Sequence, residues 1–353
     1  MSTAASTVPV KPRPIPLGRR LRETGIAYAY LAPATLILLA FWLWPAIFAL
    51  FISFADYRAG GTMDFTEWWK GRNYSAVLTD AEFLRSLVNT VNFVVYSVPP
   101  SLALSLAVAV MLNQRIKFLG FFRTVYFLPY ITSIVAVSVV WLYVFNYHSG
   151  LANWLLQSVG MGKINWLADS RGIWEILAGT LIGDEHFRIG QNVDAGESPV
   201  LYTVTRLLRG PSVAMMAIII MTVWRSIGYS MVIFLAGLQG IDRSYYEAAE
   251  IDGATPWQKF WHITWPLISP YTFFLAVIST IFAFKEFVPV YIMTPQGGSD
   301  YDTATVVFYL YDLAFQGRFD FDKAAAVGFV LFAILTVISL IQKRVFGRKV
   351  HYE

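Results

Sequence analysis

Cysteine is absent from the 353 residues of the chain, and charged residues are scarce. Without thiols the chain can form no disulfide and offers no thiolate to a metal ion. Lys, Arg, Asp and Glu make up 14% of the residues, against about 25% in soluble globular domains, whereas hydrophobic residues make up 56%. This balance indicates a membrane protein.

Signatures of metal and nucleotide binding are missing as well. The four histidines, His148, His186, His262 and His351, are scattered, and none pairs with another at the spacing of metal ligands. No segment fits the phosphate-binding pattern G-x-x-x-x-G-K-[ST]. We therefore predict no metal site, no catalytic residues and no cofactor held by this chain, so that any ATP-driven step needs a separate polypeptide.

Six hydrophobic runs approach or exceed the roughly 20 residues that cross the hydrocarbon of a bilayer. They are Ile26–Phe54, Leu87–Leu112, Val125–Tyr147, Val213–Leu238, Tyr271–Met293 and Ala324–Ile341. We predict an all-α integral membrane fold in which six transmembrane helices form one domain, residues 26–341.

The distribution of Lys and Arg predicts the orientation, because short basic segments stay on the cytoplasmic side. These segments are the proline-rich tail 1–25, the loop after the second run, the loop 240–270 and the tail 342–353. The opposite loops are longer and rich in acids, and they include an extracytoplasmic insertion at residues 170–210. Both termini are therefore expected in the cytoplasm.

Three ionisable residues lie within the hydrophobic runs. Arg225 is near the middle of the fourth run, and Lys285 and Glu286 are in the outer half of the fifth. A charge at that depth is costly unless it is paired or in contact with water. Two interpretations stay open: an Arg225–Glu286 ion pair that pins two helices, or a polar lining for a hydroxylated or anionic solute.

The loop between the fourth and fifth runs reads EAAEIDGATPWQKFWHITWPLISP and carries two helix-start signals. Ser244 with Glu247, and Thr255 with Gln258, each fit a capping box. Gly253 fits the left-handed position that ends a helix. The pattern predicts a helix–turn–helix hairpin, which either merely connects two spans or forms a knob that fits a groove in a partner.

This loop resembles the EAA loop of ATP-binding-cassette importer permeases, whose pattern is matched by Glu247, Ala248, Ala249 and Gly253, then Ile263 and Pro266. The resemblance implies the type I importer permease fold and a hairpin that couples to an ATPase. We expect coupling residues Glu247, Ala248, Ala249, Asp252 and Gly253. The implied partners are a second, similar permease, two ATPase subunits that hold ATP and Mg²⁺, an extracytoplasmic solute-binding protein and membrane lipid, with no nucleic acid.

Further stretches, including AYLAPATLILLAFWLWPAIFALFISF and VWRSIGYSMVIFLAGLQ, are similar to the carbohydrate branch of these permeases, of the maltose and glycerol-phosphate type. The resemblance implies a bacterial or archaeal inner-membrane subunit that imports a sugar, oligosaccharide or related polyol. The resemblance to the maltose permease implies a substrate pathway along one face of the fourth run, at Thr222, Arg225, Ser226 and Tyr229, with Ser279 opposite. The ionisable Lys285 and Glu286 are expected to join it. The sequence departs from the family at about Arg171–Arg209 and at Thr294–Ser299.

Two other classes of protein are weighed against a permease. An ion-coupled secondary transporter needs acids buried at mid-membrane, and only Glu286 is a candidate. An integral-membrane glycosyltransferase would use loop aspartates such as Asp300 and Asp302, which lack the spacing of a metal site or of an acid–base pair. The sequence therefore favours a transport subunit over an enzyme.

Overall fold

The computed structural model describes residues 17–57, 63–64, 71–114, 117–184, 187–189 and 198–346. Within these residues the chain is helical, no strand forms, and β pairing is limited to the isolated bridges Asp56–Asp64 and Gly172–Ser212. The prediction of an all-α fold is confirmed. The chain divides into two compact units, residues 1–52 and 53–353.

The first unit holds most of one apolar helical segment, Arg22–Phe54, that is long enough to cross a membrane. In this segment α1 (Leu17–Leu38) continues through the π-helical turn η1 (Leu39–Leu43) into α2 (Trp44–Phe54). The second unit contains α3 (Arg72–Thr79), α4 (Ala81–Leu112), α5 (Leu119–Ile131), α6 (Ile134–Val144), α7 (Leu151–Ser158), α8 (Ile173–Ile182), α9 (Pro199–Arg209), α10 (Val213–Gln239), α11 (Arg243–Ile251), α12 (Pro256–Lys259), the π-helical turn η3 (Phe260–Thr264), α13 (Trp265–Leu267), α14 (Ser269–Phe284), α15 (Val288–Met293), the 3-10 turn η4 (Pro295–Gly297), α16 (Val306–Phe315) and α17 (Phe321–Phe346).

Among the described residues, four helical segments are long and apolar enough to cross a bilayer, and two bent helix pairs bring the number to six. The third predicted span is one of these pairs, since α5 and α6 meet at 96°. Thr132 and Ser133 take extended backbone there, and the Thr132 hydroxyl donates to the Leu128 carbonyl at 2.9 Å. The third predicted span, Val125–Tyr147, is therefore formed by two helices with a sharp bend between them.

The fifth predicted span is interrupted as well. The segment α12–α13 bends by 63° into α14, which ends at Phe284, and α15 begins only at Val288. Pro289 lies in the first turn of α15, where its missing amide proton is tolerated. Lys285 and Glu286, which lie in the outer half of the fifth run, are thus at a break between two helices.

Helix α4 is the central element of the second unit. It begins at Asp80, whose carboxylate accepts hydrogen bonds from the Glu82 and Phe83 amides at 2.8 and 3.2 Å. From there α4 contributes to all three hydrophobic clusters of the core: Phe83 packs with α16 and α17, Phe93 with α10, and Leu106 with α10 and α14. The other helices of the bundle are therefore positioned against α4.

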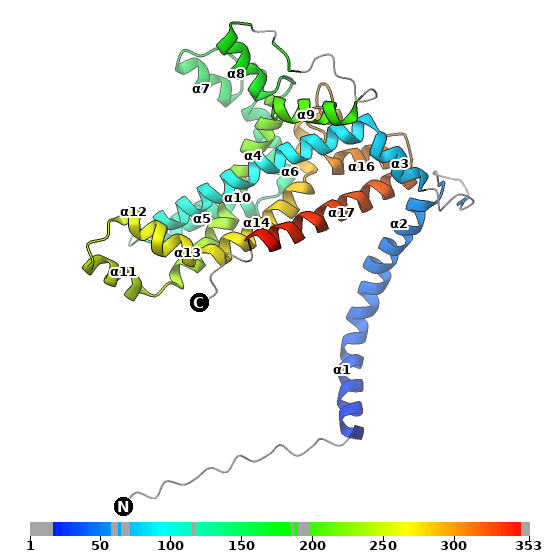
Figure 1. Ribbon diagram of the computed structural model, residues 1–353, viewed down its shortest axis with the longest axis horizontal. Helices are drawn as coiled ribbons and strands as arrows, with labels where there is room; N and C mark the ends of the chain where they lie inside the picture. Colours follow the sequence, from blue (N-terminus) through cyan, green and yellow to red (C-terminus); the bar gives the residue numbers. More distant parts are fainter. Residues whose placement is uncertain are drawn as a thin grey trace, which may run out of the picture. The chain divides into compact units, whose positions relative to one another are not determined.

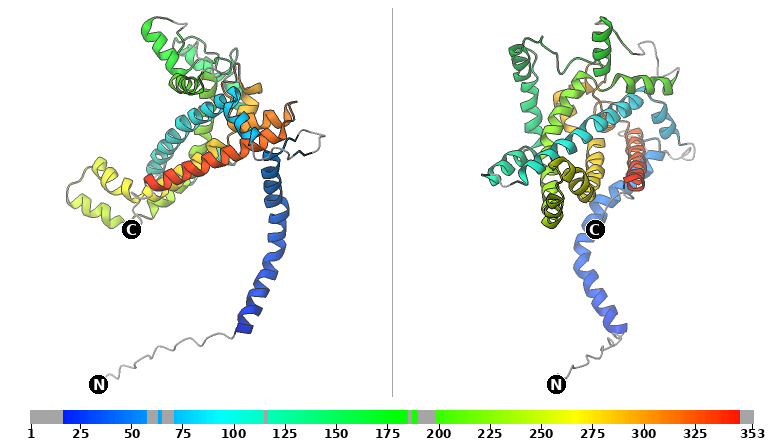
Figure 2. Two further views of the ribbon diagram at one scale, coloured as in Figure 1. Left: turned by 45° about the vertical axis from the view of Figure 1, so that its right-hand side comes forward. Right: turned by 60° about the vertical axis from the view of Figure 1, so that its left-hand side comes forward.

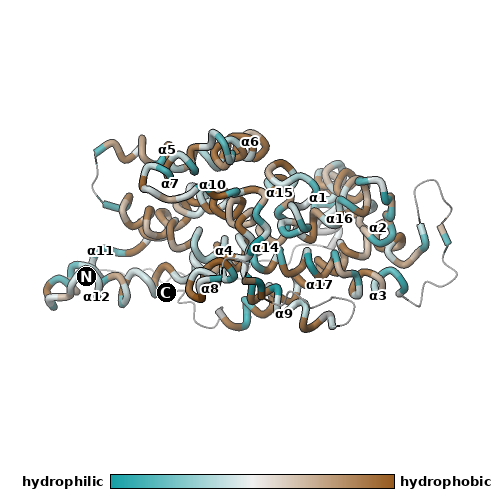
Figure 3. The backbone as a smooth tube through the Cα atoms, turned by 90° about the horizontal axis from the view of Figure 1, so that it is seen from above, coloured by the Kyte–Doolittle hydropathy of each residue, from teal (hydrophilic) through white to brown (hydrophobic). Residues whose placement is uncertain are grey.

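The short helices outside the bundle of the second unit lie at two opposite ends of it. The α11–α12 hairpin projects at one end, and α7, α8 and α9 lie at the other (Figures 1 and 2). Hydrophobic residues dominate α5, α6 and α10 between these ends (Figure 3). This distribution is the one expected for a bundle whose middle lies in hydrocarbon.

Helices α10 and α5 pack closely at Gly228, and this contact can be tested by its effect on stability. A Cβ at Gly228 would fall on the Tyr126 carbonyl oxygen and lie 2.8 Å from the Phe127 Cα, both backbone atoms that cannot move aside. We expect Gly228→Ala to lower the free energy of unfolding by about 1–3 kcal/mol, because overpacking pushes the helices apart. Thermal unfolding of the purified chain in detergent measures the change.

Gly120→Ala is the matched control, because Gly120 lies in α5 with no atom within 4 Å of an added Cβ. Alanine is the better helix former by about 1 kcal/mol, so this variant should unfold at the wild-type temperature or above. Equal losses in the two variants would contradict the close-packing explanation.

Candidate functional site

The first arm of the hairpin, α11, begins at Asp242. The Asp242 carboxylate accepts a hydrogen bond from the Ser244 amide at 2.9 Å, and this bond lowers the pKa of Asp242 below its usual range. The predicted Ser244–Glu247 capping box was therefore wrong, because the residue two positions earlier is the N-cap. Aspartate and serine are both good N-caps, and the local sequence alone did not decide between them.

The turn of the hairpin confirms the role predicted for Gly253. Its φ is +74°, in the left-handed region that favours glycine, and the Gly253 amide donates to the Glu250 carbonyl at 3.1 Å. The Ala254 amide donates to the Ala249 carbonyl at 2.8 Å, which completes a Schellman motif. The second capping box is also confirmed, since Thr255 and Gln258 exchange hydrogen bonds at the start of α12.

Side-chain contacts hold the two arms together. Lys259 Nζ lies 2.7 Å from Glu250 Oε1, and the Tyr246 and Thr264 hydroxyls are 2.9 Å apart. Trp261 packs against the rings of neighbouring aromatic residues, with centroids 5.3–5.8 Å apart. The hairpin is therefore braced at its turn and along its arms.

The tip of the hairpin exposes apolar, small and acidic residues outside the bundle. Of the five predicted coupling residues, Glu247, Ala248, Asp252 and Gly253 are exposed and Ala249 is half-buried. Ile251 lies beside them with 88% of its surface exposed, and Tyr245 with 54%. A large aliphatic side chain left this open beside small residues and acids suits contact with another protein.

A polar cavity of about 340 Å³ lies between α4, α5, α10 and α14. All seven residues of the predicted substrate pathway line it: Thr222, Arg225, Ser226, Tyr229, Ser279, Lys285 and Glu286. The four from α10 are spaced by three, one and three residues, which places them on one face of that helix. Their shared face explains how residues of one sequence stretch converge on a single cavity.

Sequence reasoning missed the wall that α4 and α5 supply. Ser97 and Ser101 of α4 and Tyr130 of α5 line the same cavity, and the Tyr130 ring stacks on Tyr229 with centroids 4.9 Å apart. The serines recur at a spacing of four within an apolar run, at positions 97, 101 and 105. That spacing signals a polar stripe along one side of the helix and was available in the sequence.

Arg225 lies against α5. Its Nη2 is 3.4 Å from the Tyr130 carbonyl oxygen and its guanidinium lies 5.3 Å from the centroid of the Tyr130 ring. Within the part of the chain that the structure describes, no ion pair joins Arg225 to Glu286, and the buried Arg225 Nε has no hydrogen-bond partner. Arg225 and Glu286 thus form no direct ion pair in this structure, and the guanidinium keeps hydrogen-bonding capacity for another group.

The break at Lys285–Phe287 is stabilised from elsewhere in the fold. The Thr305 hydroxyl donates to the Glu286 carbonyl at 2.7 Å and also accepts from the Phe308 amide at the start of α16. Irregular backbone at membrane depth persists only where its polar groups are satisfied within the protein. The break turns Lys285 and Glu286 toward the cavity that both residues line.

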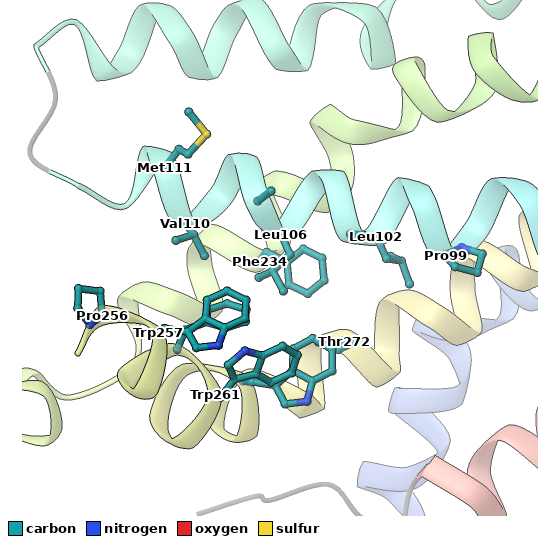
Figure 4. Close-up of a pocket in the computed structure, with 14 residues that line it drawn as sticks. Pro99, Leu102, Leu106, Val110, Met111, Phe234, Pro256, Trp257, Trp261 and Thr272 are labelled. Atoms are coloured by element: carbon teal, nitrogen blue, oxygen red, sulfur yellow. The ribbon is translucent and has the colours of Figure 1, made fainter. Parts of the chain in front are cut away.

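A larger groove, of about 710 Å³, lies between α4, α10 and the second arm of the hairpin. Leu102, Leu106 and Val110 of α4 face the indole rings of Trp257 and Trp261 across it (Figure 4). Its lining is almost entirely apolar, so it offers few partners to hydroxyl or charged groups. The smaller polar cavity is therefore the better candidate for a hydrophilic molecule.

Metal binding finds no support in the described part of the chain, where no three His, Asp or Glu side chains gather closely enough to hold an ion. The cavity instead combines hydroxyl groups, three aromatic rings and three charged side chains. Such a lining suits a polar organic molecule bound by hydrogen bonds and ring stacking.

Comparison with known proteins identifies relatives. Residues 198–352 match the family model described as binding-protein-dependent transport system inner membrane component. The probable ABC transporter permease protein YesP of Bacillus subtilis is 32% identical over 341 residues, 95% of this chain and 95% of the relative. The lactose transport system permease protein LacF of Rhizobium radiobacter is 31% identical over 323 residues, 89% of this chain and 92% of the relative.

The fold has a solved counterpart. A chain in the crystal structure of a bacterial alginate ABC transporter, in complex with an alginate pentasaccharide-bound periplasmic protein, superposes with a TM-score of 0.71. The two chains are 22% identical over 94% of this chain and 97% of that one. The comparisons favour neither the secondary transporter nor the glycosyltransferase.

The N-cap of α11 yields a test of the hairpin's local structure. Asp242→Ala removes the acceptor of the Ser244 amide, so the amides of the first turn should exchange with solvent on the order of fivefold faster. Because its pKa is lowered, the Asp242 cap is complete above the usual aspartate range and is lost as pH falls through the lowered value. Hydrogen exchange read by mass spectrometry measures both effects.

Ser244→Ala is the comparison, because it keeps the Ser244 amide that donates to the cap and removes only the additional side-chain bond to Asp242. Exchange in the first turn should rise by less than in Asp242→Ala. Faster exchange in Ser244→Ala than in Asp242→Ala would restore the Ser244 capping box and refute the Asp242 assignment.

Proposed function

The chain belongs to the family of binding-protein-dependent transport system inner membrane components, as a multi-pass permease of ABC importers, and from this premise we propose its solute and partners. The proposed solute is a sugar, oligosaccharide or related polyol. The observation that carries this choice is the polar cavity, in which all seven predicted pathway residues meet. Its hydroxyl-rich lining suits a molecule that presents many hydroxyl groups.

The cavity's aromatic and charged groups refine the solute class. The stacked Tyr130 and Tyr229 rings offer an apolar face and two phenol groups, the combination that suits a sugar ring. Arg225 and Lys285 add two cations against the one carboxylate of Glu286, which favours a solute that also bears a phosphate or carboxylate. The relatives whose names mention lactose and alginate are consistent with carbohydrate import.

The proposed assembly contains a second, similar permease, two ATPase subunits that hold ATP and Mg²⁺, and an extracytoplasmic solute-binding protein in a bacterial or archaeal inner membrane. The family name supports the binding protein, and the exposed hairpin tip supports an ATPase as its partner. With both termini cytoplasmic, the hairpin faces the cytoplasm and α7–α9 face the outside. Glu247, Ala248, Ala249, Asp252 and Gly253 are proposed as the contact with the ATPase.

Coupling follows from how the hairpin joins the cavity walls. Helix α10 leads into the hairpin and α14 leads out of it, and both line the cavity. Because the hairpin is braced, an ATPase that moves it moves α10 and α14 together. ATP-driven closure of the ATPases thereby biases the cavity between inward- and outward-facing states.

Disruption of the hairpin tip tests the coupling. Gly253→Pro removes the Gly253 amide from the Schellman motif and cannot adopt a φ of +74°. We expect it, like Glu247→Lys at the exposed tip, to abolish solute-stimulated ATP hydrolysis while the permease still inserts. The measurement is phosphate release by the reconstituted assembly with and without solute-loaded binding protein.

The matched control is Gly160→Pro, which removes a similar glycine, with φ of +80°, just after α7, where its amide donates to the Gln157 carbonyl. This variant should keep solute-stimulated hydrolysis, because α7 is not part of the hairpin and does not line the cavity. Wild-type stimulation in both Gly253→Pro and Glu247→Lys would show that the hairpin does not couple to the ATPase.

Loss of an aromatic wall tests the cavity. Tyr229→Ala removes one of the stacked rings, so the solute concentration at half-maximal uptake should rise by about tenfold, equivalent to roughly 1.4 kcal/mol. Uptake of labelled sugar into proteoliposomes measures the change. Tyr143→Ala in α6 is the control, since Tyr143 is 70% exposed and does not line the cavity. An equal rise of the half-maximal concentration in Tyr229→Ala and Tyr143→Ala would show that the solute does not bind in this cavity.

A further inference from the structure

The insertion between α7 and α10 is built around a buried carboxylate. Glu175 of α8 is 1% exposed and lies 3.1 Å from Arg209 Nε and 3.5 Å from Arg188 Nη1. It also accepts hydrogen bonds from the Gly172 and Ile189 amides at 3.0 and 2.9 Å. A buried charge with this many donors fixes α8 to the end of α9.

Helix α9 turns its polar face toward the bundle. Tyr202, on that face, is 6% exposed, whereas Val200 and Leu208 on the other side are 75% and 60% exposed. The Arg206 guanidinium lies 5.3 Å from the centroid of the Tyr202 ring, and Arg85 Nε of α4 donates to the Tyr202 hydroxyl at 2.7 Å. The inward face of α9 thus packs on the start of α4.

The Asp300 carboxylate forms ion pairs with one arginine of α4 and one of α9. Its carboxylate accepts from Arg206 Nη2 of α9 at 3.2 Å and from Arg85 Nη1 of α4 at 3.0 Å, and Arg85 also donates to the Asp300 carbonyl. Asp300 belongs to the segment 294–305, here called the outer loop, which joins α15 to α16. A second link runs from the Ser299 hydroxyl to the Ala168 carbonyl at 3.0 Å.

The outer loop is stiff and ends at the cavity. The Gly297 carbonyl accepts from the Thr303 and Ala304 amides, and the Thr303 hydroxyl donates to that of Thr294 at 2.8 Å. Its last residue, Thr305, donates to the Glu286 carbonyl. A restraint on Asp300 therefore reaches the break that turns Lys285 and Glu286 toward the cavity.

We propose that α8 and α9 form a clamp on the outer loop, with Asp300 as its attachment point, and that this clamp keeps the cavity closed on the α9 side. The inference rests on the proposed solute path. Opening toward α9 requires the outer loop to leave Arg206 and Arg85. Asp300 and Arg206 are thus positioning residues that set the balance between the closed and open states.

Accessibility of a cavity residue tests the clamp. The chain contains no cysteine, so Ser226→Cys gives this subunit a single thiol on the cavity wall. The assembly of permeases and ATPases, in vesicles without ATP, is treated on the α9 side with a membrane-impermeant maleimide. Asp300→Asn and Arg206→Gln should each raise the labelling rate about three- to tenfold, as expected when partly exposed ion pairs that favour the closed state are lost.

Two controls separate the clamp from general damage. Asp300→Glu keeps the carboxylate and should label near the wild-type rate, and Arg72→Gln removes an exposed ion pair with Asp56 that leaves the outer loop untouched. Unchanged labelling in Asp300→Asn and Arg206→Gln, or an equal rise in Arg72→Gln, would overturn the clamp. A thiol that reacts from neither side, with or without ATP and vanadate, would overturn the solute path itself and the clamp with it.

Discussion

The hydrogen bond from the Thr305 hydroxyl to the Glu286 carbonyl makes the cavity possible. A membrane helix that stops in the middle of the bundle leaves backbone groups that hydrocarbon cannot satisfy. Here one hydroxyl ties the interruption to another helix, since it caps α16 and satisfies the Glu286 carbonyl within the break. Thr305, which stabilises the break, is also the last residue of the outer loop. Movement of the outer loop is therefore coupled to the break.

That break lets one helix perform two tasks. Because α14 ends at Phe284, its charged neighbours Lys285 and Glu286 reach the cavity, while the other end of α14 continues directly into the hairpin. Helix α4 holds the other cavity walls in place through the hydrophobic core. It carries Phe83, Phe93 and Leu106 into three separate hydrophobic clusters and presents Ser97 and Ser101 to the polar side.

The sequence predicted the structural features that local contacts along the chain determine. The family resemblance placed Thr222, Arg225, Ser226 and Tyr229 on one face of the fourth span, and local helix geometry sets that face and the turn at Gly253. The 96° bend after Ile131 and the break at Lys285 were not predicted. The break is satisfied by Thr305, a residue distant along the chain, which apolar composition does not reveal.

The ends of the second unit are connected through the cavity walls. At one end, the Val213 amide donates to the Arg171 carbonyl and the Ile173 amide to the Pro211 carbonyl, so the start of α10 is fastened to the base of α8. Helix α10 then runs past the cavity to the hairpin, and α14 returns past the cavity to the break and the outer loop. A displacement of the hairpin therefore has two routes to the clamp, and each route passes through side chains that line the cavity.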